Sequence, residues 1–311
     1  MVQDAKQTKK VDPKAPNLSL DDQQVLIDFV KNSSNVMDLL PRVNSHLKQI
    51  INETEVGKKY QIVFLHDQFS SINDYTSDRI YRALSKSKDK DVLLVLSTTG
   101  GQIEPAYLIS KCCKEYSKEK FVVVIPRRAK SAGTLLALGA DEIHMGSMSQ
   151  LGPIDPQIGG LPALGLSNAV EYIAMFCKRW PESSDMFAKY LSNKLDLRIF
   201  GYFERVAESA VHYAVRLLGD KKLPDTKTAQ DVASALVYSY KDHNFVIDKS
   251  EAKQLLGDIV TGETDEYALG DKIYKFLEML QLLVFVFHKK QLSLVGNADS
   301  GIEFSDVAEN Q

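Results

Sequence analysis

The sequence predicts an α/β protein with a mostly parallel sheet, flanking helices and a helical C-terminal part. Three observations indicate this fold class. First, apolar segments alternate with helical patterns between residues 60 and 145. Second, residues 91–97 and 121–126 form nearly continuous apolar runs, which is typical of strands buried on both faces of a parallel sheet. Third, a polar or glycine-rich turn follows each run, where such sheets place their sites.

The expected elements follow from local patterns. YQIVFLH at 60–66 is rich in branched and aromatic residues and predicts a strand. Ile80, Tyr81 and Leu84 lie on one side of the helix expected at 73–86. The other elements expected before residue 160 are helices from about Leu20 and over 36–51, 104–116 and 131–139, and strands over 91–98, 121–126 and 141–145. From about residue 163, the pattern is mainly helical, over 166–179, 184–192, 197–218, 226–236 and 248–256.

These elements indicate one domain over residues 19–293, with a core at 56–160 and a helical part at 161–293. Residues 1–18 are rich in Lys, Asp, Gln and Pro and are expected to form a disordered tail. Residues 294–311 are polar and acidic and are expected to be a second flexible tail.

Composition limits the classes of function. The net charge is -3, so there is no electrostatic case for a nucleic acid partner. Three cysteines without metal spacing (Cys112, Cys113 and Cys177) indicate free thiols in a reducing compartment. No signal peptide or transmembrane segment is expected, because the apolar stretch 276–287 is too short to cross a bilayer. The chain is therefore predicted to be cytoplasmic, with the segment 274–287 buried or at an interface.

Ser131 is the first candidate for chemistry. It follows the apolar run 121–126 and a basic loop, and it precedes Ala132-Gly133 at the start of a small-residue helix. A helix cap is one interpretation and a nucleophile is the other. In the second case, the Ala132 N–H and the Gly100-Gly101 turn could form an oxyanion hole. Lys130, next to the serine, is expected to be solvated or to face the substrate.

A serine nucleophile also needs a base near neutral pKa. Among the six histidines, only His243 combines a loop position with flanking acids, Asp242 and Asp248. Lys178, Lys189 and Lys194 are alternative bases. Asp155, held extended by the following proline, could orient a base or could cap a local turn.

Four stretches together resemble the serine dehydrogenase proteinase family of the Clp/crotonase superfamily, which is related to Clp peptidase and signal peptide peptidase A. They are STTGG at 97–101, AKSAGT at 129–134, GADEIHMG at 139–146 and LGPIDPQ at 151–157. The later stretch 240–248 also resembles that family, so that the resemblance covers about residues 56–290.

The resemblance implies a Clp/crotonase-like fold and a serine peptidase that forms an acyl-enzyme on Ser131. It implies oxyanion donors at Gly100, Gly101 and Ala132, His243 as the first choice of base, Lys178 or another lysine as the second, and Asp155 as the orienting acid. No metal or organic cofactor is implied, the substrate is expected to be a peptide or protein, and a homo-oligomer is expected. The alternatives are an inactive oligomeric scaffold and a crotonase-like acyl-thioester enzyme.

Overall fold

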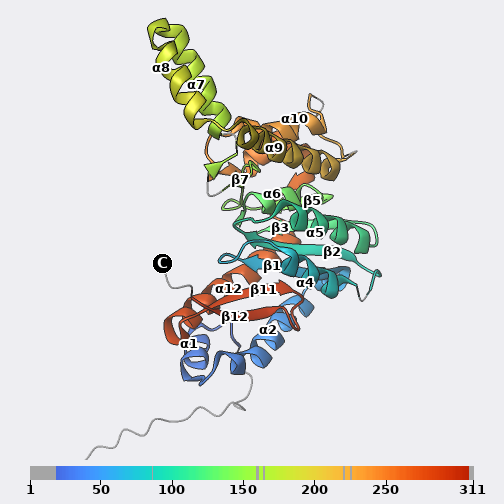
Figure 1. Ribbon diagram of the computed structural model, residues 1–311. Coiled ribbons are helices and arrows are strands. Elements are labelled where there is room, and N and C mark those ends of the chain that lie inside the picture. The colour runs from blue at the N-terminus through green and yellow to red at the C-terminus, as the bar shows by residue number, and fades with distance from the viewer. Residues whose placement is uncertain are drawn as a thin grey trace, which may run out of the picture.

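One mixed sheet organises the protein, and helices cover both of its faces (Figure 1). The structure is a computed structural model, and it describes residues 19–85, 87–158, 161–163, 165–219, 221–224 and 226–307. The expected tail at residues 1–18 lies outside the described residues.

The sheet has the strand order β10-β5-β3-β2-β1-β11-β12. Its first five strands are parallel, whereas β11 and β12 are antiparallel to their neighbours. The bounds are β1 Tyr60–Asp67, β2 Asp91–Thr98, β3 Phe121–Ile125, β5 Glu142–Met145, β10 Val260–Thr261, β11 Lys290–Gly296 and β12 Ile302–Asp306. The predicted mostly parallel sheet is therefore confirmed.

Successive residues of the central strands enter two different cores, because side chains alternate across a strand. In β2, Leu94 and Leu96 join the core beneath α4 and α5, whereas Leu93 and Val95 join the core beneath α1, α2 and α12. Burial on both faces explains why β3 is apolar throughout and why β2 is apolar from Val92 to Leu96.

Helices from both halves of the chain surround the sheet, whereas α7 and α8 project away from it. Their bounds are α1 Gln23–Asn32, α2 Leu40–Asn52, α3 Glu55–Lys59, α4 Asp74–Leu84, α5 Ile103–Tyr116, α6 Ala132–Ala137, α7 Gly165–Arg179, α8 Ser184–Lys194, α9 Leu197–Leu218, α10 Ala229–Ser234, α11 Lys249–Leu256 and α12 Asp265–His288. Single turns of other helix types lie at Val36–Leu39, Pro181–Ser183, Ala235–Ser239 and Gly257–Ile259.

A branch of three two-residue strands leaves the main sheet at the end of β2. The strand β4 (Arg128–Ala129) pairs with β2, β6 (Gln150–Leu151) pairs with β4, and β9 (Ile247–Asp248) pairs with β6. This branch brings residues near 130, 150 and 245 to one place, although they are far apart in the sequence.

One part of the chain differs from the expectation. The predicted flexible tail at 294–311 contains β12, which pairs with β11 over five residues. This strand arises from long-range pairing of a sequence that is locally polar. The apolar segment 276–287, expected to be buried or at an interface, is the end of the longer helix α12, where Leu280 and Val284 are buried while Leu282 and Val286 are exposed.

The helices α7 and α8 form a hairpin that projects from the rest of the molecule (Figure 1). No residue of either helix is buried. A short antiparallel pair, β7 (Gln157–Ile158) and β8 (Leu161–Pro162), leads into them.

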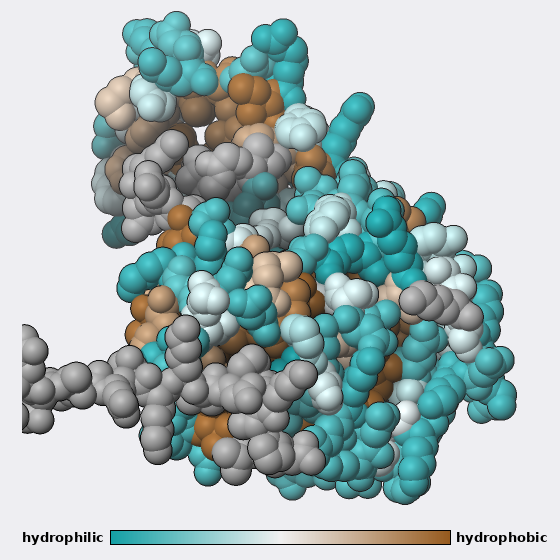
Figure 2. Space-filling model, turned by 90° about the horizontal axis from the view of Figure 1, so that it is seen from below, coloured by the Kyte–Doolittle hydropathy of each residue, from teal (hydrophilic) through white to brown (hydrophobic). Residues whose placement is uncertain are grey.

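Seen from below, the surface is mostly hydrophilic, with scattered hydrophobic patches (Figure 2). In the described part of the chain, no helix has the length and apolar character that a membrane crossing requires.

Candidate active site

The loop that carries Ser131 is docked on the end of β2. Ala129 pairs with Thr98, and the Lys130 N–H donates a hydrogen bond of 3.1 Å to the Thr98 carbonyl. Ser131 then takes φ 51° and ψ -119°. A positive φ is uncommon for a residue other than glycine and costs about 1–3 kcal/mol. The surrounding contacts therefore hold this serine in a strained conformation at the start of α6.

Ser131 does not act as a side-chain cap. It precedes α6, but its hydroxyl accepts no hydrogen bond from the first turn of that helix. Among the described residues, the hydroxyl has no hydrogen-bond partner at all, and the side chain is partly accessible. The capping interpretation of Ser131 is therefore wrong, and the hydroxyl is free for other contacts.

Thr134 fixes the first turn of α6 against the neighbouring strands. Its hydroxyl donates to the Ala129 carbonyl at 2.7 Å and accepts from the Gly152 N–H at 3.0 Å. Both contacts are buried, so the loop before Ser131, the helix after it and the residue after β6 are held together.

Gly100 packs directly against the serine loop. A Cβ at this position would lie 2.8 Å from the Ser131 Cβ and 2.9 Å from the Lys130 carbonyl oxygen, and φ is 115°. Only glycine fits here without displacing the loop. The Gly100 N–H already donates to the Thr98 hydroxyl at 3.1 Å.

The Gly101 and Ala132 amides differ from the Gly100 amide. Within the ranges that the structure describes, neither has a hydrogen-bond acceptor, while the residues around Gly101 pair with Ile72. Of the three predicted oxyanion donors, Gly101 and Ala132 therefore have free N–H groups. Gly100 instead allows its turn to pack closely against the serine loop.

His243 and Asp155 lie in contact, although 88 residues separate them. The His243 Nδ1 is 2.7 Å from the Asp155 Oδ1, and the Gln157 side-chain amide donates to the other carboxylate oxygen at 2.8 Å. Asp155 is only 5% exposed. An ionised carboxylate can only accept, so this contact favours a proton on Nδ1, and in the neutral imidazole the lone pair then lies on Nε2.

The branch of short strands joins the segments that carry this pair to β4, the strand that leads into the serine loop. Asp155 follows β6, His243 precedes β9, and both strands belong to the branch that begins at β4. The two acids that flank His243 in the sequence have local roles instead: Asp242 accepts from the Asn244 N–H, and Asp248 caps α11. Asp155 is thus the acid that the fold brings to His243.

Lys178 is not brought to this place. It is an exposed residue in the last turn of α7, in the hairpin that projects from the body (Figure 1). Of the other two lysines, Lys189 forms an ion pair with Asp185 and Lys194 ends α8.

Lys130 differs from its expected solvated or substrate-facing position. Its ammonium group donates to the carbonyls of Leu151 and Phe245. Sequence reasoning also missed Gln157. No local pattern indicates the role of Lys130, because the short strands bring its two acceptors together. Gln157 lies only two residues from Asp155, but its bond gains a role only through the contact of Asp155 with His243.

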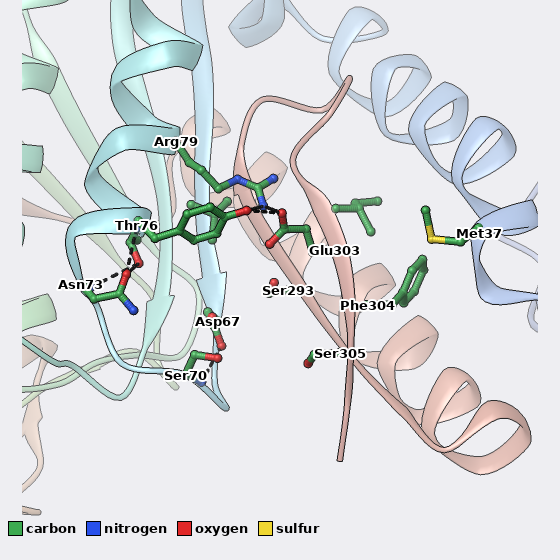
Figure 3. A pocket seen from close by; sticks show the side chains of 13 residues that line it. Met37, Asp67, Ser70, Asn73, Thr76, Arg79, Ser293, Glu303, Phe304 and Ser305 are labelled. Carbon is green, nitrogen blue, oxygen red and sulfur yellow. Dashed lines mark hydrogen bonds and ion pairs between the residues drawn. The ribbon is translucent and has the colours of Figure 1, made fainter. Parts of the chain in front are cut away.

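A separate cavity of about 370 Å³ lies between α4, the end of β1, and β11 and β12 (Figure 3). Within it, the Glu303 carboxylate accepts a hydrogen bond from the Tyr75 hydroxyl and forms an ion pair with Arg79. None of the residues expected in the active site lines this cavity.

Comparisons with known proteins give a family match. A family model for ClpP-like SDH-type serine proteinases matches residues 38–285, about four fifths of the chain. Two uncharacterized proteins of Methanocaldococcus jannaschii are 31% identical over 209 residues and 29% identical over 213 residues. These matches cover 67% and 68% of this chain, but just under two thirds of each relative, 66% and 64%.

Solved structures of two variants of the 1510-N membrane-bound stomatin-specific protease are also similar, one of them in complex with a substrate peptide. Each is 15% identical to this chain, with TM-scores of 0.43 and 0.42. The first match covers 71% of this chain and 84% of that structure, and the second covers 81% and 93%.

Proposed function

The chain belongs to the ClpP-like SDH-type serine proteinase family, and from this premise we propose that it is a serine peptidase with Ser131 as its nucleophile. The observation that carries the proposal is the His243–Asp155 hydrogen bond of 2.7 Å, on segments that the short strands join to the loop of a strained serine whose hydroxyl is free. A nucleophile, a base and an acid that orients the base are the parts that acyl transfer needs.

In the proposed reaction, the Ser131 hydroxyl attacks the carbonyl carbon of the scissile peptide bond. His243 Nε2 takes the hydroxyl proton and then gives it to the leaving amine. Asp155 holds the imidazole through Nδ1 and stabilises the imidazolium that forms. Water then attacks the acyl-enzyme, His243 takes its proton, and the ester bond to Ser131 breaks to restore the hydroxyl.

The free N–H groups of Gly101 and Ala132 would stabilise the oxyanion of the tetrahedral intermediate. Removing one such donor typically costs a factor of 10²–10³ in kcat, which is about 3–4 kcal/mol. In this scheme, Gly100 allows the Gly101 amide to come close to Ser131, because any side chain on Gly100 would meet the serine loop.

The contact between His243 and Asp155 also favours a peptidase over the two alternatives. A crotonase-like acyl-thioester enzyme would need the oxyanion hole but neither a serine nucleophile nor an oriented base. An inactive scaffold would need neither the strained Ser131 nor a buried acid on His243.

The test is labelling of wild-type protein and Ser131→Ala with a fluorophosphonate probe at several pH values. We expect labelling in the wild type and none in the variant. A midpoint near pH 6–7 would assign the base to His243, and a higher midpoint would assign it to a lysine. Wild-type protein that does not label would overturn the peptidase proposal, and binding of coenzyme A would then support the acyl-thioester alternative.

We also propose that the protein is a cytoplasmic homo-oligomer that cleaves peptides or unfolded proteins. The α7–α8 hairpin supports self-association, because Tyr172 and Met175 on α7 are 69% and 70% exposed and Met186 and Tyr190 on α8 are also exposed. The three cysteines are free thiols, as expected in a reducing compartment. Sedimentation of wild-type protein and of Tyr172→Ser/Met175→Ser tests the assembly, and we expect the variant to be smaller.

A further inference from the structure

We propose that Lys130 is a positioning residue that clamps the turn carrying His243 against β6 and thereby holds His243 beside Ser131. This inference rests on the proposed function, because it assigns the element that sets the distance between the base and the nucleophile.

The Lys130 side chain joins two segments that are distant in the sequence. Its ammonium group donates to the Leu151 carbonyl in β6 at 3.0 Å and to the Phe245 carbonyl at 2.9 Å. Phe245 is two residues after His243, and Lys130 is directly before Ser131. One side chain therefore connects the loop of the nucleophile to the turn of the base.

The path of this side chain depends on Gly152. A Cβ on Gly152 would lie 2.7 Å from the Lys130 Cδ. The Gly152 N–H is itself fixed by the Thr134 hydroxyl at 3.0 Å. Gly152 thus provides the space through which the lysine reaches both carbonyls.

Apolar burial does little to hold the turn in position. Residues 241–246 are exposed except for His243, and Phe245 and Val246 are 43% and 52% exposed. The turn is closed by the Phe245 N–H, which donates to the Asp242 carbonyl at 3.0 Å. Besides the packing of the Phe245 ring on Tyr240, with centroids 4.9 Å apart, and the pairing of Ile247 with Leu151, the polar contacts of Lys130 and of the His243–Asp155 pair hold the turn.

Electrostatics agree with a structural use of this lysine. Burial, and then the charge of Arg128, lower the pKa of the Lys130 ammonium group. Its two carbonyl acceptors compensate the burial by replacing hydrogen bonds to water. Both bonds go to backbone carbonyls of β6 and the turn, and within the described residues the Lys130 ammonium group forms no hydrogen bond with the Ser131 hydroxyl, so Lys130 is assigned to positioning and not to proton transfer.

The test compares wild-type protein with Lys130→Met, Lys130→Arg and the matched surface control Lys111→Met. Two readouts are needed: the rate of fluorophosphonate labelling and kcat with KM on a peptide substrate, and amide hydrogen exchange of residues 241–246. Exchange reports the clamp independently of activity, through the amides of Asn244 and Phe245, which are hydrogen-bonded to Asp242.

We expect Lys130→Met to exchange faster in this segment and to lose kcat on the order of 100-fold, with KM changed by less than about 3-fold, because a misplacement of about 1 Å costs that much. Lys130→Arg should recover part of kcat, because a guanidinium group can donate to both carbonyls. Lys111→Met should match the wild type.

Unchanged exchange or unchanged labelling in Lys130→Met would overturn the inference while leaving the peptidase intact. If Lys130→Met loses its structure globally, Lys130→Arg becomes the deciding variant. A Lys130→Arg protein with neither normal exchange nor recovered kcat would also overturn the inference. Wild-type protein that does not label would instead overturn the proposed function, and the positioning role with it.

Discussion

Replacement of Asp155 by asparagine is the sharpest test of the proposed mechanism. In the wild type, Oδ1 accepts from His243 Nδ1 and Oδ2 accepts from Gln157. An asparagine has one oxygen and one NH₂ group for these two positions. If its oxygen keeps the Gln157 contact, its NH₂ group faces Nδ1 and favours the imidazole tautomer with the proton on Nε2, which cannot accept a proton from Ser131.

The expected loss is large because Asp155 is buried and water cannot replace it. A wrong tautomer in a Ser-His-Asp arrangement lowers kcat by about 10⁴, which corresponds to about 5.4 kcal/mol of transition-state stabilisation. KM should change little, because Asp155 is predicted to touch the base and not the substrate. Steady-state kinetics on a peptide substrate measures both parameters, and circular dichroism checks the fold.

Asp242→Asn is the matched control, since Asp242 flanks His243 in the sequence but its carboxylate accepts from the Asn244 N–H, a bond that the amide oxygen of asparagine can keep. We expect this variant to keep kcat within about 3-fold, as expected for a surface substitution without a catalytic role. Folded Asp155→Asn protein that retains a tenth or more of the wild-type kcat would refute the reasoning that Asp155 orients the base.

Four further predictions concern the serine loop, the candidate lysine and a buried histidine. Gly100→Ala should abolish labelling and lower the free energy of unfolding by about 2 kcal/mol or more, because φ is 115° and the new methyl group meets the Ser131 Cβ; normal labelling would contradict the packing. Ser131→Gly should be about 1 kcal/mol more stable to urea than Ser131→Ala, because only glycine tolerates φ 51° without strain; equal stabilities would show that the serine is not strained. Lys178→Ala should keep kcat within about 2-fold, since Lys178 lies on the projecting hairpin; a loss of activity at normal assembly size would return a lysine to the mechanism. Burial lowers the pKa of His66 to about 4 from 6.5. Between these two values the native state binds fewer protons than the unfolded state, so the free energy of unfolding falls as the pH falls. From pH 7.5 to 5 the wild type should lose about 2 kcal/mol of this free energy, and His66→Gln should lose about 2 kcal/mol less than the wild type.

The sequence alone determined the central layer of this protein. The strand β3 is apolar in every position and β2 is apolar from Val92 to Leu96, because both faces are buried, and that local pattern distinguishes them from half-exposed strands. The turns after these strands were also predictable, because each apolar run ends where its strand leaves the sheet. The local pattern was therefore enough to place Ser131 and Gly100 at one edge of the sheet.

Tertiary structure decided what lies opposite them. Strands of two residues, such as β4, β6 and β9, have no sequence period to detect, yet they bring Asp155 to His243 and Lys130 to the Phe245 carbonyl. The strands β11 and β12 likewise form only because β1 offers an open edge for antiparallel pairing. Long-range pairing depends on which distant segments meet, and the local sequence does not specify that.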